Sequence, residues 1–258
     1  MKTLDGTTKL IVPLCCALLV SVTASSTRCE PLLYPSDAKY TAEDAQRMAA
    51  VAQGVLAPVY APLAEQIVRD FDLADKPGIG IDVGSGHGTL IIELCKRTRM
   101  HWINADINPH VFPIFFRAAE EAGLGGRVSA VFADAQAMPF RDNFADVIVS
   151  RGVLQFWEDK QRAFSEIYRV LKPGGVAFIG RGFSDNLPVD VARKIRAAQT
   201  ATEEEKDKDS VTKYKVSDLE SELRQIMKDL RIERYKMRIP KPPGSEGIKY
   251  GIWIEIHK

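Results

Sequence analysis

Three glycines at alternate positions constrain this chain more than any other feature. Gly84, Gly86 and Gly88 lie within residues 79–90, where an apolar run ends in Asp82 and breaks into the glycines. Glycine adopts positive φ without a steric penalty, and backbone amides at such a turn, and at the start of a following helix, can approach a ligand closely. The pattern predicts a strand that turns into a helix beside a nucleotide-like cofactor. A tight strand-to-helix connection without a ligand is the alternative interpretation.

Acidic residues follow the next two predicted strands. Residues 101–106 read as a short apolar strand ending in Asp106, about twenty residues beyond the glycines, the spacing at which a βαβ unit delivers a carboxylate to ribose hydroxyls. A third strand at residues 128–133 precedes Asp134. Two successive strand ends that carry acids beside a glycine turn are hard to explain by core packing alone. A fourth and a fifth strand are predicted at residues 144–150 and 175–180.

These features belong to a series of motifs that runs through the chain. The series comprises Ile-Asp-Val-Gly-Ser-Gly-His-Gly at residues 81–88, Asp106, Ala-Asp-Ala at 133–135, Met-Pro-Phe at 138–140, Phe-Ala-Asp-Val-Ile at 144–148 and Glu-Ile-Tyr-Arg-Val-Leu-Lys-Pro-Gly-Gly at 166–175. Over residues 41–182 it resembles the class I S-adenosylmethionine-dependent methyltransferases, most closely the small-molecule enzymes related to those of ubiquinone and menaquinone biosynthesis. A dinucleotide-binding Rossmann domain fits less well, because the glycines are spaced Gly-x-Gly-x-Gly and Asp134 would have no evident task.

The fold class expected is α/β. Amphipathic helices at residues 88–97, 109–122 and 160–171 lie between the predicted strands, and this alternation implies a parallel sheet. The resemblance implies a Rossmann-like sheet of seven mostly parallel strands with helices on both faces and a C-terminal antiparallel hairpin. The remaining elements expected are a helical region at 41–71 interrupted near Pro58 and Pro62, helices at 188–200 and 216–230, the latter capped by Ser217, and strands at 232–239 and 250–256.

Length and composition favour one catalytic domain over residues 30–258. With 258 residues and 45% hydrophobic content, the chain can bury a sizeable core. Within this domain we expect an N-terminal helical lid at 41–75, a cofactor-binding core at 76–182, and C-terminal helices with the hairpin at 183–258. The formal net charge is +1 and no long basic stretch occurs. Nucleic acid is therefore a poor candidate for the partner, because phosphate binding needs concentrated Lys and Arg.

Residues 1–29 form an apolar leader. Lys2 and Lys9 precede the apolar segment 10–22, and small residues follow it, which is the layout of a secretory signal. The segment is shorter than the roughly twenty apolar residues of a spanning helix, and Pro13 weighs against a permanent anchor. An uncleaved anchor, a misread start and an apolar tail packed on the domain are the alternatives. The leader favours an exported or membrane-associated protein, whereas the cytosolic synthesis of S-adenosylmethionine favours a cytoplasmic one.

Cysteine and histidine predict no metal site. No pair of cysteines has the spacing of zinc ligands, and the four histidines are scattered. Cys95 shares a predicted helix face with Leu90, Ile91 and Leu94, so we expect a buried structural thiol.

The resemblance assigns the methionine part of S-adenosylmethionine to the glycine turn. Gly84, Ser85, Gly86 and Gly88 are expected to wrap it, with Asp82 orienting the loop or the cofactor's amino group. Asp106 is expected to bind the ribose and Ile107 to pack on the adenine. Asp134 would accept from the exocyclic amine and the Ala135 amide would donate to a ring nitrogen, while Ser150 and Arg151 would lie near the methionine portion and the substrate entrance. His87, where small residues are commoner, reads as a solvent-facing filler rather than as a catalytic group.

Substrate contacts are expected at the ligand-side edge of the sheet. Arg151, Gln155 and Arg181 follow strand ends there, and two arginines would suit an anionic substrate. Arg151 holding the cofactor carboxylate is the alternative. Tyr40 and Tyr60 resemble tyrosines that line the cofactor mouth in the family, and packing roles are the alternative for each of these residues.

The function implied is in-line transfer of the cofactor's methyl group to a small-molecule acceptor. The enzyme's main task would be alignment of the acceptor nucleophile behind the methyl group, which can contribute about 7–11 kcal/mol. A thiolate or an acidic carbon needs little activation, whereas a hydroxyl needs a general base, and the sequence presents no evident one. A non-catalytic S-adenosylmethionine-binding module and a membrane-associated quinone or lipid methyltransferase are the alternatives. The sequence specifies neither the acceptor nor the oligomeric state.

Overall fold

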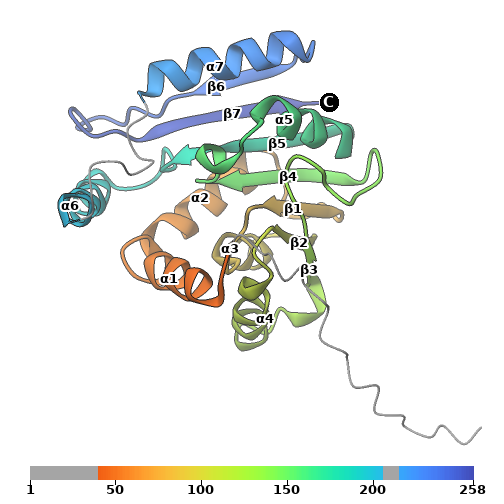
Figure 1. The fold of residues 1–258 in the computed structure, drawn as a ribbon, viewed down its shortest axis with the longest axis horizontal. Helices are drawn as coiled ribbons and strands as arrows, with labels where there is room; N and C mark the ends of the chain where they lie inside the picture. The colour runs from red at the N-terminus through yellow and green to blue at the C-terminus, as the bar shows by residue number, and fades with distance from the viewer. Residues whose placement is uncertain (1–39, 206–214) are drawn as a thin grey trace, which may run out of the picture. The chain divides into compact units, whose positions relative to one another are not determined.

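A seven-stranded sheet organises residues 40–205 and 215–258, the part of the chain that the computed structural model describes (Figure 1). Its strand order is β3-β2-β1-β4-β5-β7-β6. The first five strands pair in parallel, and β7 pairs antiparallel with both β5 and β6. The predicted fold class is confirmed. The strands are β1 Ile79–Val83, β2 His101–Asp106, β3 Val128–Phe132, β4 Ala145–Arg151, β5 Leu171–Gly182, β6 Tyr235–Arg238 and β7 Gly251–His257.

Helices cover both faces of this sheet (Figure 1). Apolar residues of α5 and α7 pack on one face, and those of α2, α3 and α4 pack on the other. The α-helices are α1 Ala42–Gln53, α2 Ala57–Asp70, α3 Thr89–Cys95, α4 Phe112–Glu121, α5 Lys160–Val170, α6 Val189–Glu205 and α7 Val216–Asp229, and the short 3-10 turns are η1 Pro109–Val111, η2 Gly125–Arg127 and η3 Leu154–Phe156.

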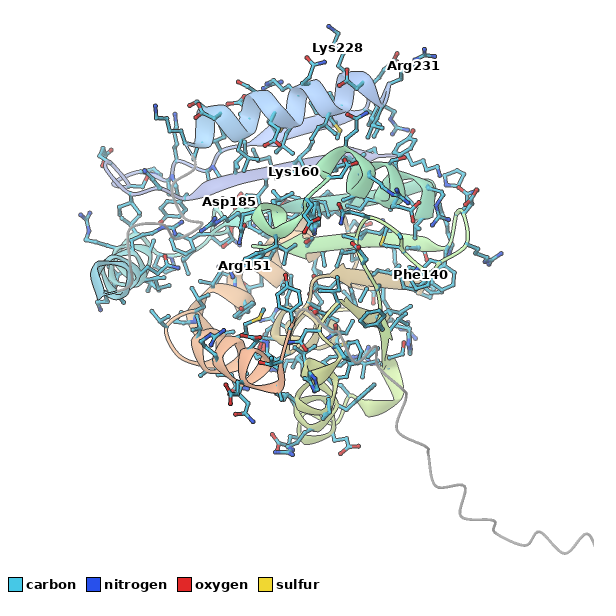
Figure 2. The ribbon with its side chains drawn as sticks, viewed as in Figure 1. Phe140, Arg151, Lys160, Asp185, Lys228 and Arg231 are labelled. Carbon is cyan, nitrogen blue, oxygen red and sulfur yellow. The ribbon has the colours of Figure 1, made fainter. Side chains whose placement is uncertain are left out.

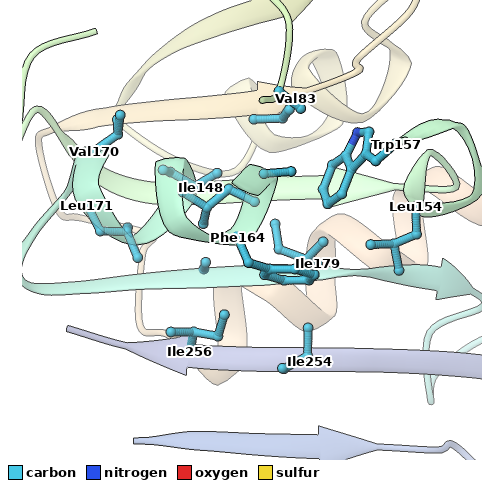
Figure 3. Close-up of a cluster of buried hydrophobic side chains, with 14 of the residues drawn as sticks. Val83, Ile148, Leu154, Trp157, Phe164, Val170, Leu171, Ile179, Ile254 and Ile256 are labelled. Carbon is cyan, nitrogen blue, oxygen red and sulfur yellow. The ribbon is translucent and has the colours of Figure 1, made fainter. Parts of the chain in front are cut away.

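Burial of large apolar side chains holds the layers together. Phe164 of α5 is fully buried against Ile148 of β4, Ile179 of β5 and Ile254 of β7 (Figure 3). Each such side chain contributes about 1.5–3 kcal/mol through removal from water. The predicted buried thiol is confirmed as well, because Cys95 is buried in α3 and burial raises its pKa to about 11.

Local sequence explains where α1 begins and why the helical region breaks before α2. Thr41 caps α1 by accepting from the Asp44 amide, while the Asp44 carboxylate accepts from the Thr41 amide. The predicted interruption of the N-terminal helical region lies at residues 54–56, just before Pro58. Pro58 itself stands in the first turn of α2, where proline is tolerated. The predicted interruption near Pro62 is wrong, because α2 continues through this residue.

Two predicted details of the C-terminal part are corrected. Ser217 does not cap α7: the N-cap is Lys215, and the Ser217 hydroxyl donates to Asp218 Oδ1 at 3.1 Å instead. The strand predicted at 232–239 contains only the four residues of β6, because only these pair with β7.

The chain divides into two units, Met1–Ser36 and Asp37–Lys258, and the sheet with its helices belongs to the second. The leader at residues 1–29, with its signal-like pattern, lies outside the described residues. Among residues 40–205 and 215–258, no helix combines the length and the apolar character that a bilayer crossing requires.

Candidate functional site

The candidate site lies at the carboxyl edge of the parallel strands. The strand order reverses between β1 and β4, and ligands of open α/β sheets bind at such a switch point, outside the carboxyl ends of the strands. Asp82 of β1, Asp106 of β2 and Arg151 of β4 all stand at or near this edge. Figure 2 shows Arg151 at the arrowhead end of β4. Three of the predicted site residues therefore meet at the place where the topology favours a ligand.

Glycine is required at the three positions of the turn for different structural reasons. All have positive φ, +69° at Gly84, +58° at Gly86 and +78° at Gly88. A Cβ at Gly84 would lie 2.6 Å from Val153, and one at Gly88 would overlap the Phe115 ring. At Gly86 the nearest described atom to an added Cβ would be Cε of Met48, 3.9 Å away. Packing therefore excludes side chains at the outer glycines, whereas Gly86 borders open space beside α1.

Asp106 fixes the loop from the neighbouring strand. Its side chain is 5% exposed, its Oδ2 accepts from the Gly86 amide at 2.7 Å, and its Oδ1 accepts from the Asn108 amide at 2.8 Å. Burial raises the pKa of this carboxyl, and the backbone amides of Asn108, Gly86 and Ile107 lower it. Each carboxylate oxygen can accept more than one hydrogen bond. Asp106 can therefore hold the loop and still accept from ribose hydroxyls.

Two charged groups at the site have buried atoms without partners. Asp82 is 2% exposed, and its Oδ1 lacks a hydrogen-bond partner within the described ranges. The pKa of Asp82 is raised to about 7, mainly by burial. The nearby Asp106 carboxyl also raises this pKa, whereas the Ser85 hydroxyl and the Arg151 guanidinium lower it. Arg151 Nε likewise has no partner among the described side chains and backbone groups. Native proteins rarely leave such groups unpaired, so these atoms indicate places for ligand contacts.

Tyr60 brings α2 to this cluster. The Arg151 guanidinium lies 5.3 Å from the centre of the Tyr60 ring, in a cation–π contact. Burial raises the pKa of Tyr60, which Arg151 opposes. The phenol therefore stays neutral at physiological pH, and Tyr60 supports Arg151 by packing.

His87 is not the solvent-facing residue that the sequence suggested. It is only 6% exposed, because its ring lies edge-on to Tyr60, with centroids 6.5 Å apart, and its Nε2 is 3.1 Å from Thr89 Oγ1. Burial lowers its pKa to about 4, so the imidazole is neutral near pH 7. The contact with Tyr60 of α2 accounts for the difference.

The remaining predicted cofactor residues lie around this centre. The Ser150 hydroxyl is buried and donates to the Val83 carbonyl at 2.7 Å, so it joins β4 to β1. Ile107 leaves 38% of its surface exposed directly after β2. The Ala133 amide donates to the Asp106 carbonyl at 3.0 Å, which places the following residues next to β2. In that segment Asp134 Oδ1 accepts from the Gln136 amide at 2.9 Å, and Ala135 is buried. On the glycine turn, the buried Ser85 hydroxyl makes no hydrogen bond of normal geometry to a described residue.

The predicted substrate residues are less closely gathered. Gln155 donates to the Gly152 carbonyl at 2.6 Å, and its Oε1 is buried without a partner in the described chain. Arg181 is half-buried on β5, opposite Ile252 of β7. Tyr40 is half-buried just before α1. The roles of Gln155, Arg181 and Tyr40 in substrate binding stay predictions.

Asn108 is a site residue that the sequence reasoning missed. Its Nδ2 donates to the Thr41 carbonyl at 3.2 Å, and its Oδ1 accepts from the His110 amide at 3.1 Å. Asn108 therefore ties the loop after β2 to the start of α1. An Asn directly before Pro109 is a turn signal that could have marked this position.

Comparisons with known proteins agree with this geometry. Residues 81–179 match the family described as a methyltransferase domain. The chain is 36% identical over 103 residues to the ubiquinone/menaquinone biosynthesis C-methyltransferase UbiE of Vibrio cholerae, covering 39% of this chain and 40% of that protein. It is 37% identical over 98 residues to the chloroplastic 2-methyl-6-phytyl-1,4-hydroquinone methyltransferase 2 of rice, Oryza sativa, covering 38% of this chain and 27% of that protein. The chain thus spans well under half the length of these curated relatives.

A solved structure matches over most of both chains. It is that of a Methanococcus maripaludis protein assigned to the S-adenosyl-L-methionine-dependent methyltransferases, with 31% sequence identity and a TM-score of 0.70. The match covers 87% of this chain and 96% of the other. The similarity therefore extends well beyond residues 81–179.

Proposed function

Because the chain belongs to the class I S-adenosylmethionine-dependent methyltransferases, we propose that it transfers the methyl group of S-adenosylmethionine to a small-molecule acceptor. One observation carries the proposal: a buried carboxyl oxygen of Asp82 and a buried nitrogen of Arg151, two side chains that interact electrostatically, both lack a hydrogen-bond partner among the described residues. The amino-acid part of S-adenosylmethionine carries an ammonium and a carboxylate group. An acceptor and a donor of opposite charge, close together, fit these two groups.

The loop residues and the strand ends share the binding. Gly84, Ser85, Gly86 and Gly88 wrap the methionine part, Asp82 accepts from its ammonium group and Arg151 donates to its carboxylate. An ammonium group beside Asp82 favours the ionised carboxylate, so binding near neutral pH releases a proton from part of the molecules. Asp106 accepts from the ribose hydroxyls with the lone pairs that the backbone amides leave available.

The adenine site would lie between the loops after β2 and β3. The exposed side chain of Ile107 offers an apolar contact for the ring. Asp134 accepts from the exocyclic amine, and the Ala135 amide donates to a ring nitrogen. Ser150 supports the site indirectly, since its hydroxyl holds β4 against β1.

The bound cofactor supplies an electrophilic methyl group on a positively charged sulfur. The chain's own contribution is to position the reactants. Side chains of β2 hold the glycine turn through hydrogen bonds to Gly86, and Met48 of α1 lies beside the open face of Gly86. Holding the acceptor nucleophile in line behind the methyl group can contribute about 7–11 kcal/mol. The lid at 41–75 is the segment that we assign to enclosing the acceptor, and Tyr40, Tyr60, Gln155 and Arg181 are its proposed contacts.

The acceptor proposed is a small molecule. The two curated relatives are named for quinone and hydroquinone methylation, and the shared part of the chain is the cofactor-binding half, which supports the methyl donor more strongly than the acceptor. The comparisons favour neither a non-catalytic binding module nor a membrane-associated enzyme.

Calorimetric titration of the full chain with S-adenosylmethionine tests the proposal. We expect micromolar binding, which Asp106→Ala weakens by about 1–3 kcal/mol because it leaves polar partners unsatisfied. Asp229→Ala, on the exposed side of α7, is the matched control and should bind as the parent does. Release of S-adenosylhomocysteine in the presence of candidate acceptors then tests catalysis. Absence of binding by a folded chain would overturn the proposal.

A further inference from the structure

A fully buried polar side chain stands in the middle of β2. Asn104 is 0% exposed, and strand alternation places it on the same face as Trp102 and Asp106. Trp102 packs in the core on this face, and Asp106 reaches the glycine turn. Asn104 therefore lies between the core and the candidate site.

Asn104 and Asp106 together hold one residue of the turn. Asn104 Nδ2 donates to the Gly86 carbonyl at 2.8 Å, and Asp106 Oδ2 accepts from the Gly86 amide at 2.7 Å. Both backbone polar groups of Gly86 thus end on side chains of the same strand. Gly86 is the glycine with φ of +58° whose open face borders the space assigned to the cofactor.

Stability alone does not explain an asparagine here. Its Oδ1 is buried and has no hydrogen-bond partner among the residues that the structure describes. A half-satisfied buried amide is unfavourable compared with an apolar side chain of similar size, which would fill the same space. The amide direction is set by the Gly86 carbonyl, which can only accept, so the contact itself is the evident reason for the polar side chain.

The neighbouring strand reinforces this interpretation. Asn104 is in register with Asp82 of β1, so the two side chains lie on adjacent strands at the same level of the sheet. Asp82 carries another buried oxygen for which residues 40–205 and 215–258 supply no hydrogen-bond partner. Asn104 and Asp82 are thus two polar side chains side by side on adjacent strands, and Asp82 lies close in sequence to the turn, to which Asn104 is hydrogen-bonded.

We propose that Asn104 is a positioning residue for cofactor binding, which fixes the peptide groups around Gly86 so that the open face of this glycine meets S-adenosylmethionine. The inference rests on the proposed function, since it assigns Asn104 to the same site. Asn104 acts through Gly86 and makes no contact with the reacting atoms.

The test is calorimetric titration of the full chain with S-adenosylhomocysteine. Asn104→Leu keeps the branched shape and the number of heavy atoms but cannot donate, and Asn104→Ala is a second variant in case the larger leucine disturbs packing. Thr98→Val is the matched control. Its hydroxyl is also buried, donates to the Leu94 carbonyl at 2.9 Å and accepts from Trp102 Nε1 at 3.1 Å, so the substitution breaks buried hydrogen bonds beside the same strand but away from the turn.

We expect Asn104→Leu and Asn104→Ala to raise the dissociation constant about tenfold, while Thr98→Val leaves it within about twofold of the parent. All titrations are made at a temperature where circular dichroism shows every variant folded. A variant that only lowers the free energy of unfolding would then leave the dissociation constant unchanged. Parent-like affinity in a folded Asn104 variant, or an equal loss in Thr98→Val, would overturn the inference. Failure of the parent chain to bind would instead refute the proposed function, which keeps the two failures distinct.

Discussion

Alanine substitutions at Gly88 and Gly86 should separate folding from cofactor binding. Both residues have positive φ, and this conformation costs an L-residue about 1–2 kcal/mol. At Gly88 the new methyl group would also overlap the ring of Phe115, which is fully buried, and such overpacking costs about 1–3 kcal/mol more. Gly88→Ala should therefore lower the free energy of unfolding by about 2–5 kcal/mol, and Gly86→Ala by only about 1–2 kcal/mol.

Affinity for S-adenosylmethionine should follow the opposite order. The methyl group of Gly86→Ala would enter the open space beside Met48, where we place the cofactor, so this variant should bind weakly while it remains the more stable one. Gly88→Ala, where it folds, should bind better than Gly86→Ala, because its methyl group points into the core.

Urea unfolding followed by circular dichroism gives the stabilities, and calorimetric titration gives the affinities. Gly123→Ala is the control for backbone strain alone, since φ is +70° there and no described atom lies within 4 Å of an added Cβ. The packing argument is refuted if Gly88→Ala unfolds no more easily than Gly123→Ala. The placement of the cofactor is refuted if Gly86→Ala binds as tightly as the parent.

Two further predictions concern buried charge. Burial raises the pKa of Asp82 from 3.8 to about 7, so the folded chain holds a proton that the unfolded chain releases; the stability of the parent relative to Asp82→Asn should fall as pH rises from about 4 to about 7. Urea unfolding of both proteins across this range measures the difference, and a constant difference would contradict the expected burial effect. Arg238 of β6 bridges Asp70 of α2 and Glu255 of β7, two largely buried carboxylates, so Arg238→Met removes a cation that both share and should lower the free energy of unfolding by about 1–3 kcal/mol. Cofactor affinity should stay unchanged in that variant, and weaker binding without a loss of stability would show that the bridge serves the site instead.

The sequence predicted the cofactor-binding part of the sheet well, because its strands are short apolar runs with an acid or a serine at the carboxyl end. Parallel strands place those ends at one edge, so Asp82 and Asp106 could be assigned to one site before their distances were known. The prediction was weaker for β6, whose extent depends on pairing with β7 rather than on its own pattern. The break between α1 and α2 could be predicted only approximately, since Gly54 and Pro58 indicate a helix boundary but do not determine the residue at which it lies.

Side-chain direction was the part that the sequence did not determine. His87 was expected to face solvent, but Tyr60 from α2 covers it, and a contact between residues so distant in sequence leaves no local signal. Ser150 stands at the predicted strand end, yet its hydroxyl turns to the Val83 carbonyl. Asn104 offered a usable signal, because a polar residue between Trp102 and Asp106 in alternation must lie on the buried face.

The glycine turn takes its conformation from other elements rather than from its own side chains. Phe115 of α4 excludes a side chain at Gly88, while Asn104 and Asp106 of β2 hold both peptide groups of Gly86. Contacts of the first kind are made in the hydrophobic core and contribute to folding whether or not a ligand binds. Contacts of the second kind orient the peptide groups of the turn, and we expect them to contribute mainly to the affinity for a ligand. Substitutions around one short turn should therefore fall into two groups, those that change the free energy of unfolding and those that change cofactor affinity, and the element behind each glycine determines the group.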